Sequence, residues 1–393
     1  MILQIFIAVL LGILAGTFTG LIPGIHVNLV SASVVALFYG SSLNPLLIAA
    51  FIVAMAVTHS FLDSIPSIFL GAPDADQAMG VLPGHKMLLA GRGILAVKLT
   101  LAGSVLSLLL SLALSPLFFL LLKYGYVYIR PFIPFALIAI ALWLILRDSK
   151  PFFAFFVFVS TGVLGYLVFQ APIRNSLFPL LTGLFGIATL LLSLKTKPKI
   201  PPQDSVGMHA STTKPGIVAA LTGGLTGVLP GIGSAAAAGL ASVAWKRITP
   251  ESFLVLVGGI NTANFMMSIW SLYVLEKARN GAVIAVQSIL ERVSFSHVLL
   301  FIGVGLVAGG LAFFLALKLT LLFAKIVPRI PYSLLVSSII VFLVGMTFVL
   351  SGWLGFVILA TSASLGMIAP LAGCARVHGM GCILIPVVIF LLV

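Results

Sequence analysis

A segment that contains a Pro-Gly pair occurs twice in this chain, each time inside a long apolar run. Residues 16–31 read GTFTGLIPGIHVNLVS, and residues 223–238 read GGLTGVLPGIGSAAAA. A Pro-Gly pair breaks a helix, because proline lacks an amide donor and glycine permits a sharp reversal. In hydrocarbon the freed backbone groups need partners, so such a break persists only against protein or a watery cavity. Two broken apolar segments at matching positions are typical of the binding site of a secondary transporter.

The composition predicts an all-α polytopic membrane protein. Of the 393 residues, 61% are hydrophobic and only 7% are charged, which is too few charges to cover a soluble protein. The residues after Met1 lack the basic start and cleavage site of a signal peptide, so we expect them to belong to the mature protein. The net charge of +13 comes from basic residues scattered between apolar runs. This pattern indicates positive-inside topology signals rather than nucleic-acid binding, and we expect a multi-pass protein of the cytoplasmic membrane.

A Pro-rich basic linker divides the chain into two apolar halves. We predict a first membrane repeat at residues 1–194, a cytoplasmic linker at 195–215 and a second membrane repeat at 216–393. In each half, the Pro-Gly segment is followed by about five apolar runs of helix length. The predicted runs are 44–70, 94–122, 131–147, 151–170 and 175–194 in the first half, and 252–275, 296–323, 332–350, 353–371 and 379–393 in the second.

Further matches between the halves favour gene duplication. Residues 58–61 (THSF) align with residues 262–265 (TANF), a register that places Asp63 opposite Met267. The later matches are Leu164-Gly165 with Leu365-Gly366 and residues 133–135 with 330–332. Because these matches occur in the same order in both halves, we interpret the chain as an internal repeat.

The distribution of charge indicates how the halves are oriented. If each Pro-Gly segment is a re-entrant hairpin that does not cross, about five crossings remain per half, and an odd number inverts the second half. With the linker in the cytoplasm, the inverted arrangement collects most lysines and arginines on the cytoplasmic side, as the positive-inside rule requires. We therefore predict two inverted-topology repeats, each a re-entrant Pro-Gly helical hairpin plus about five transmembrane helices.

The backbone at the two breaks indicates an anion site. The helix that begins after each break directs its free N–H groups and the positive end of its dipole toward the break. We expect the two Pro-Gly tips to approach each other near the bilayer midplane; a pair of packing kinks is the alternative interpretation. The predicted substrate-binding residues are Thr19, Pro23, Gly24, His26, Asn28, Thr226, Pro230, Gly231, Gly233, Ser234, Asn261 and Asn264.

Polar residues that follow the first break suggest ion coupling. The predicted ion-coupling residues are Thr58, His59, Asp63 and Ser64. A carboxylate at membrane depth costs about 2.5–3.5 kcal/mol on insertion scales, so Asp63 by default marks a site. Asp63 could bind a coupling Na⁺ or carry H⁺, with His59 as its partner one turn earlier. In the alternative interpretation, Asp63 lies near a membrane interface and is hydrogen-bonded to Ser60 or Ser67.

Arg174 and Arg376 each lie in a polar interruption between two late apolar runs. A guanidinium can bind a carboxylate or phosphate through two parallel hydrogen bonds, and it can equally reach a lipid headgroup. We expect lipid contact, with anion binding as the alternative. The chain has no Walker A sequence, and Cys374 and Cys382 have no matching set of metal ligands. We therefore expect neither an enzyme nor a resident metal or other cofactor.

The motif G-x-x-x-G-x-x-P-G-I in both halves, together with IPSIFLGAPDADQAMGVLPGHKMLLAGRG at residues 65–93, resembles the TctA-like family. This is the family of large membrane subunits of tripartite tricarboxylate transporters. The resemblance implies a translocation path for carboxylates such as citrate, driven by an ion gradient. It also implies a small membrane subunit and an extracytoplasmic binding protein as partners. By resemblance, the residues on the family's paired Pro-Gly segments are Thr19, Pro23, Gly24, Pro230, Gly231 and Gly233.

Departures from the family pattern indicate a divergent, short member. His26 stands where the usual glycine is expected, and residues 261–264 read NTAN in place of an Asn-Asn-Ala stretch. We predict a secondary active transporter for a small anionic substrate, a di- or tricarboxylate, coupled to Na⁺ or H⁺. The sequence also resembles, as the runner-up, a family that moves polyprenyl phosphates across the bilayer, so the alternative function is a lipid-phosphate translocase. A non-transporting membrane scaffold is the third possible function. The expected partners are membrane lipids, the two further subunits and a second copy of the chain in a homodimer.

Overall fold

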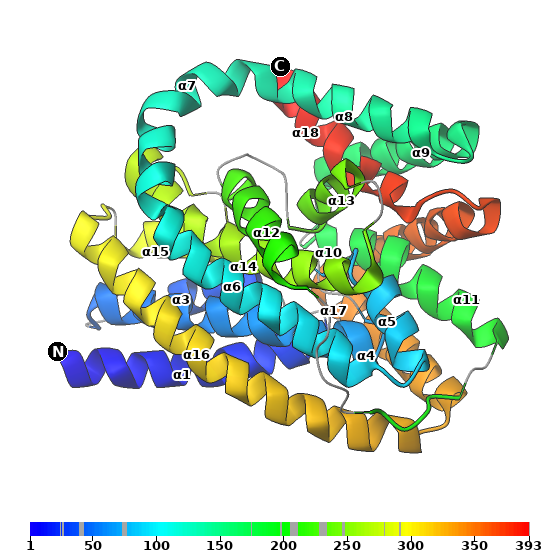
Figure 1. Ribbon diagram of the computed structural model, residues 1–393, viewed down its shortest axis with the longest axis horizontal. Coiled ribbons are helices and arrows are strands. Elements are labelled where there is room, and N and C mark those ends of the chain that lie inside the picture. The colour runs from blue at the N-terminus through cyan, green and yellow to red at the C-terminus, as the bar shows by residue number, and fades with distance from the viewer. Residues whose placement is uncertain are drawn as a thin grey trace.

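The computed structural model describes residues 1–23, 25, 27–38, 43–72, 77–173, 175–196, 199–204, 211–227, 234–245, 248–278, 280–290 and 292–392. Every regular element within these residues is a helix. In Figure 1 the ribbon of the N-terminal helix runs along one side of the molecule, and the C-terminus lies near the opposite side.

The helices of the first half follow the predicted apolar runs closely. They are α1 (Ile2–Leu21), α2 (Val27–Phe38), α3 (Pro45–Leu62), α4 (Ser64–Phe69), α5 (Val81–Leu89), α6 (Gly93–Leu120), the π-helical η1 (Leu121–Gly125), α7 (Tyr126–Ile129), the short 3₁₀ turn η2 (Arg130–Phe132), α8 (Ile133–Arg147), α9 (Pro151–Gln170), α10 (Leu177–Leu181), the π-helical η3 (Thr182–Ile187) and α11 (Ala188–Thr196). Pro45 and Pro151 each stand at the first position of a helix, where the missing amide donor is tolerated.

The second half repeats this order of short and long helices. Its elements are α12 (Thr213–Thr226), α13 (Ser234–Ala244), α14 (Pro250–Leu275), α15 (Gly281–Leu290), α16 (Phe295–Ile326), the 3₁₀ turn η4 (Val327–Arg329), α17 (Tyr332–Ala372), the 3₁₀ turn η5 (Arg376–Met380) and α18 (Gly381–Leu392). The part of the linker at 199–204 lies against the turn between α5 and α6, where the Gln203 amide oxygen accepts a hydrogen bond from the Gly93 amide.

The described residues contain 8 helical segments that are long and apolar enough to cross a membrane, so the prediction of a polytopic all-α membrane protein is confirmed. One crossing needs about 20 residues, and two segments have enough for two crossings. The segment Gly93–Arg147 has 55 residues and bends through η1 and η2. The 41 residues of α17 are interrupted at Gly352, whose φ of +65° is not helical. Its two parts agree with the separate runs predicted at 332–350 and 353–371.

The Pro-Gly segments start from helices of unequal length. The first follows α1, which has 20 residues and is long enough to cross by itself, whereas the second follows α12, which has 14 residues.

The two halves interlock rather than lie side by side. Helix α14 of the second half packs against α6 of the first, and α3 of the first half packs against α16 of the second. Small residues permit this close approach. A side chain at Gly103 of α6 would collide with the carbonyl oxygen of Val255, and one at Gly258 of α14 would collide with that of Thr100. The Ser104 hydroxyl donates a hydrogen bond to the Gly258 carbonyl oxygen at 3.1 Å.

Two further helix crossings join the halves, and each depends on one glycine. Gly165 of α9 lies against the carbonyl oxygen of Cys382 in α18, and Gly366 of α17 lies against that of Leu184 in η3. The sequence alignment matched Gly165 with Gly366, so the two glycines make corresponding contacts. Each half therefore supplies one helix to each crossing.

Candidate functional site

Each Pro-Gly segment is preceded by a helix that packs tightly on another helix of the same half. In the first half a stripe of Gly12, Gly16 and Gly20 brings α1 against α3. In the second half Gly223 and Gly227 bring α12 against α14. Because glycine has no side chain, the two backbones of each pair approach closely, as in other membrane helix pairs.

The threonine at the end of each such helix is held by a polar side chain of the partner helix. His59 Nδ1 of α3 lies 3.1 Å from Thr19 Oγ1. The Asn264 side-chain amide of α14 donates to Thr226 Oγ1, also at 3.1 Å. All four residues are buried. The two contacts have the same place in the two halves, directly before the Pro-Gly segments.

This geometry corrects the sequence alignment by one residue. The alignment paired His59 with Ala263 and Asp63 with Met267. In the structure Gly20 lies against the His59 backbone and Gly227 against the Asn264 backbone, so His59 corresponds to Asn264. By the same register Asp63 corresponds to a serine, Ser268, whose hydroxyl donates to the Gly227 carbonyl oxygen at 3.3 Å. The alignment of residues 58–61 with 262–265, which rests on a shared threonine and phenylalanine, is therefore displaced by one residue from the helix contacts.

Asp63 is the centre of a buried polar cluster that joins the two halves. It lies at the junction of α3 and α4 and is 1% exposed. Its carboxylate accepts hydrogen bonds from the side-chain amides of Asn261 at 2.8 Å and Gln77 at 3.0 Å. Asn261 belongs to α14, whereas Gln77 lies in the loop before α5. We name Asp63, Asn261, Gln77 and Ser234 the Asp63 cluster.

Ser234 extends this cluster to the second Pro-Gly segment. Its hydroxyl donates to the Asn261 side-chain oxygen at 3.4 Å, and both residues are buried. Ser234 is the first residue of α13, which directly follows that segment. Asn261 thus donates to Asp63 with its nitrogen and accepts from Ser234 with its oxygen, which fixes the orientation of the amide.

The hydroxyls of the serines near Asp63 donate to main-chain carbonyl groups. The alternative interpretation, in which Ser60 or Ser67 binds the Asp63 side chain, is therefore not what the structure has. The Ser67 hydroxyl donates to the Asp63 carbonyl oxygen at 2.8 Å, and that of Ser60 donates to the Val57 carbonyl oxygen. The Ser64 hydroxyl reaches the Phe61 carbonyl oxygen at 3.5 Å. These hydroxyls therefore satisfy helix carbonyl groups rather than the Asp63 carboxylate.

Several predicted site residues lie elsewhere or outside the described residues. Asn28 lies on α2, and its side-chain oxygen accepts a hydrogen bond from the Ala282 amide at the start of α15. Thr58 faces Gly16 of α1, and its buried hydroxyl has no hydrogen-bond partner among the described residues. Pro23 lies in the turn after α1. The predicted residues outside the described residues are Gly24, His26, Pro230, Gly231, Gly233 and Arg174.

Arg376 points into the protein. Its guanidinium donates to the Thr189 hydroxyl of α11, and its Nε is buried without a hydrogen-bond partner among the described residues. The side chain borders a small cavity together with Leu184 and Gly366. In this arrangement Arg376 ties η5 to α11 across the two halves.

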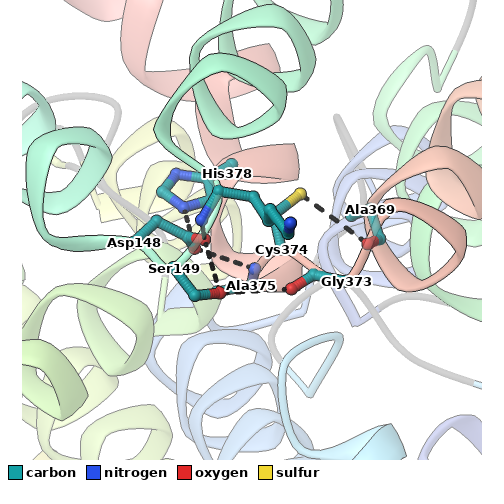
Figure 2. Close-up of polar contacts among 8 residues, drawn as sticks. Asp148, Ser149, Ala369, Gly373, Cys374, Ala375 and His378 are labelled. Carbon is teal, nitrogen blue, oxygen red and sulfur yellow. Dashed lines mark hydrogen bonds and ion pairs between the residues drawn. The ribbon is translucent and has the colours of Figure 1, made fainter.

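Sequence reasoning missed a second polar cluster, which Figure 2 shows. The Asp148 carboxylate, after α8, lies 2.9 Å from His378 Nε2 of η5 and accepts a hydrogen bond from the Ala375 amide. Burial alone would raise the pKa of Asp148, but hydrogen bonds from the Ala375 and Lys150 amides and from the His378 ring outweigh it, so the pKa lies below its ordinary value. Nothing in the local pattern around Asp148 indicates a partner 230 residues away.

Sequence comparisons agree with the membrane fold. Residues 6–381 match the Tripartite tricarboxylate transporter TctA family. An uncharacterized protein of Methanocaldococcus jannaschii is 30% identical over 341 residues, which cover 85% of this chain and 84% of that protein. No solved structure matches the chain significantly. The chain belongs to the tripartite tricarboxylate transporter TctA family.

Proposed function

We propose that this chain is a secondary active transporter for a small di- or tricarboxylate, with uptake coupled to Na⁺ or H⁺. Membership of a transporter family supports transport, and the eight apolar helical segments support a path through a membrane. We place the protein in the cytoplasmic membrane. A small membrane subunit, an extracytoplasmic binding protein and a second copy of the chain are the proposed partners.

The observation that carries the proposal is the buried Asp63 carboxylate beside α14. Asn261 and Gln77 each donate a hydrogen bond to this carboxylate, which lies inside the apolar segment Pro45–Phe69. Because carboxylates at membrane depth commonly bind ions or carry protons, Asp63 is the proposed coupling residue, and binding of Na⁺ or a proton would change the charge at this position. Its bond to Asn261, and that of Asn261 to Ser234, would pass this change to the start of α13.

In this proposal the two Pro-Gly segments form re-entrant hairpins in inverted repeats. The recurrence of the Thr19–His59 contact as Thr226–Asn264 supports two equivalent hairpins. The N–H groups at the start of the helices after the breaks would bind the carboxylates of the substrate. Ser234 and Asn261 would line the path from the side of the second half.

Uptake into proteoliposomes tests this proposal. We expect labelled citrate or succinate to accumulate under an inward Na⁺ or H⁺ gradient, and Asp63→Asn to lower the rate at least about tenfold, as for loss of an essential coupling charge. The matched control is Asp204→Asn, which removes an exposed carboxylate of the linker and should leave uptake unchanged. Normal uptake by Asp63→Asn would exclude Asp63 from coupling.

Thermal stability of the purified variants separates function from folding. Asp63→Asn turns one acceptor into a donor facing Asn261 or Gln77, so we expect some loss of stability, about 1–3 kcal/mol. Carboxylates should still raise the melting temperature of the wild-type protein, since a bound ligand stabilises the folded state. A shift caused only by short-chain polyprenyl phosphates would contradict carboxylate transport and favour a lipid-phosphate translocase.

A further inference from the structure

A groove of about 530 Å³ lies on the surface between the two halves, and no residue of the Asp63 cluster lines it. Three elements form it: α6 between Lys98 and Leu109, the start of α12 and the second half of α16. Its lining residues are Lys98, Ala102, Val105, Leu106, Leu109, Thr212, Thr213, Phe313 and Leu317. The volume falls within the range of about 300–1,000 Å³ that is usual for small-molecule sites.

The groove is polar at one end and apolar along its length. On α6, Lys98 and Leu109 mark the two ends of a single helix face, because the lining positions are three or four residues apart. Phe313 and Leu317, one turn apart on α16, form the opposite apolar wall. Lys98 therefore stands at one end of an otherwise apolar channel.

Lys98 is half-buried and forms no ion pair with any described residue. Together with Thr212 and Thr213, which also line the groove, it supplies one ammonium and two hydroxyl groups. These groups are donors, and a phosphate with its strong acceptor oxygens complements them.

We propose that this groove binds one anionic phospholipid. One acyl chain lies along the apolar walls, and the phosphate contacts Lys98 and the two threonine hydroxyls. The bilayer supplies the occupant directly, and basic groups near the membrane surface attract anionic lipids. On the predicted topology this end faces the cytoplasm, where such lipids are enriched.

The bound lipid would stabilise the packing of α6 on α14, the helix that contributes Asn261 to the Asp63 cluster. On another face, α6 packs through Gly103 against α14, the helix that carries Asn261. A lipid wedged between α6 and α16 replaces an empty groove with van der Waals contacts and favours one position of α6. The expected effect is therefore on stability as well as on lipid retention.

Native mass spectrometry of the purified full chain tests the site. We expect one phosphatidylglycerol to remain bound after delipidation, while phosphatidylcholine is lost. Lys98→Gln should weaken retention roughly fivefold, as for loss of one basic group near an anionic lipid. The matched control is Lys318→Gln, which removes an exposed lysine outside the groove and should retain the lipid. Equal retention of the two lipids by the wild-type protein would overturn the proposal.

A second measurement separates a lipid from a free anion and from loss of folding. Phosphatidylglycerol should raise the melting temperature more than phosphatidylcholine does, and inorganic phosphate should have no effect. This difference should vanish in Lys98→Gln. Ala102→Leu, which fills the apolar part of the groove and keeps Lys98, should also lower retention. Stabilisation by inorganic phosphate alone, or unchanged retention in both variants, would contradict a phospholipid site.

Discussion

Buried ionisable side chains of this protein connect segments that are far apart in the chain. Asp148 joins the end of α8 to η5 through His378 and the Ala375 amide. His85 of α5 lies 3.0 Å from the Ile68 carbonyl oxygen and 3.1 Å from the Tyr332 hydroxyl of α17. Burial lowers the pKa of His85 despite its bond to the Ile68 carbonyl group, so this ring is neutral near pH 7.

Acid should weaken the protein through Asp148. The pKa of this carboxyl group is lower in the folded protein than its unfolded value of about 3.9. Its contribution to stability is therefore fully present above about pH 4 and is lost as the pH falls through the folded pKa. As the pH decreases below about 4, we expect the melting temperature of the wild-type protein to fall more steeply than that of Asp148→Asn. Parallel curves for the two proteins would show that Asp148 does not contribute.

At the scale of helices, glycine spacing decides which faces meet. Gly12, Gly16 and Gly20 recur every four residues and so form one face of α1. A Cβ at Gly16 would collide with the Met55 carbonyl oxygen and lie 2.7 Å from Thr58 Cβ. The stripe sets the depth of α1 on α3, and with it the contact between Thr19 and His59.

Gly16→Ala should therefore destabilise the protein and weaken transport. Crowding in a tight helix crossing costs about 1–3 kcal/mol, which would lower the melting temperature by several degrees. The matched control is Gly310→Ala on α16, where nothing lies within 4 Å of the added carbon. That change should be neutral or slightly stabilising, because alanine favours a helix over glycine. Equal melting temperatures for the two variants would contradict the close packing of α1 on α3.

The whole molecule is built around α14, a helix of the second half. Of its most apolar window, 94% is buried inside the protein, so α14 has little contact with lipid. Helices of both halves enclose it, namely α3 and α6 from the first and α12, α13 and α16 from the second. Figure 1 shows this interleaving, with α6 and α16 crossing the molecule on the near side. Such an arrangement makes the stability of each half depend on the other.

Each half should consequently fail to fold when it is expressed alone, whereas the two halves should fold when they are coexpressed. We expect residues 1–204 or 205–393, expressed alone, to aggregate, because each half exposes the crossing surface of α6 or α14. Coexpressed, they should copurify and elute as one species in size-exclusion chromatography. The full-length chain cut at an inserted protease site in the linker is the control. A monodisperse, helical half-chain would show that the halves are independent units.

Local sequence patterns were sufficient to predict the membrane class and most helix boundaries. Hydropathy, proline and glycine act within a few residues, so the break near Gly352 and the duplicated motif around Thr19 and Thr226 could be read directly. Asp63 could also be recognised as a candidate site residue, because a carboxylate in an apolar run raises the free energy of membrane insertion whichever helix it packs against.

Only the tertiary structure decided which side chains meet. Gln77 and Asn261 flank Asp63 through contacts between separate elements, and no periodicity or motif links them. The same is true of Asp148 and His378, and of the register that pairs His59 with Asn264. Hydropathy states that a helix is buried but not against which neighbour, since the hydrophobic effect is non-directional. Glycines at the contacts of α14 with α6 and of α9 with α18 determine those neighbours, because only a surface without a side chain permits such close backbone packing.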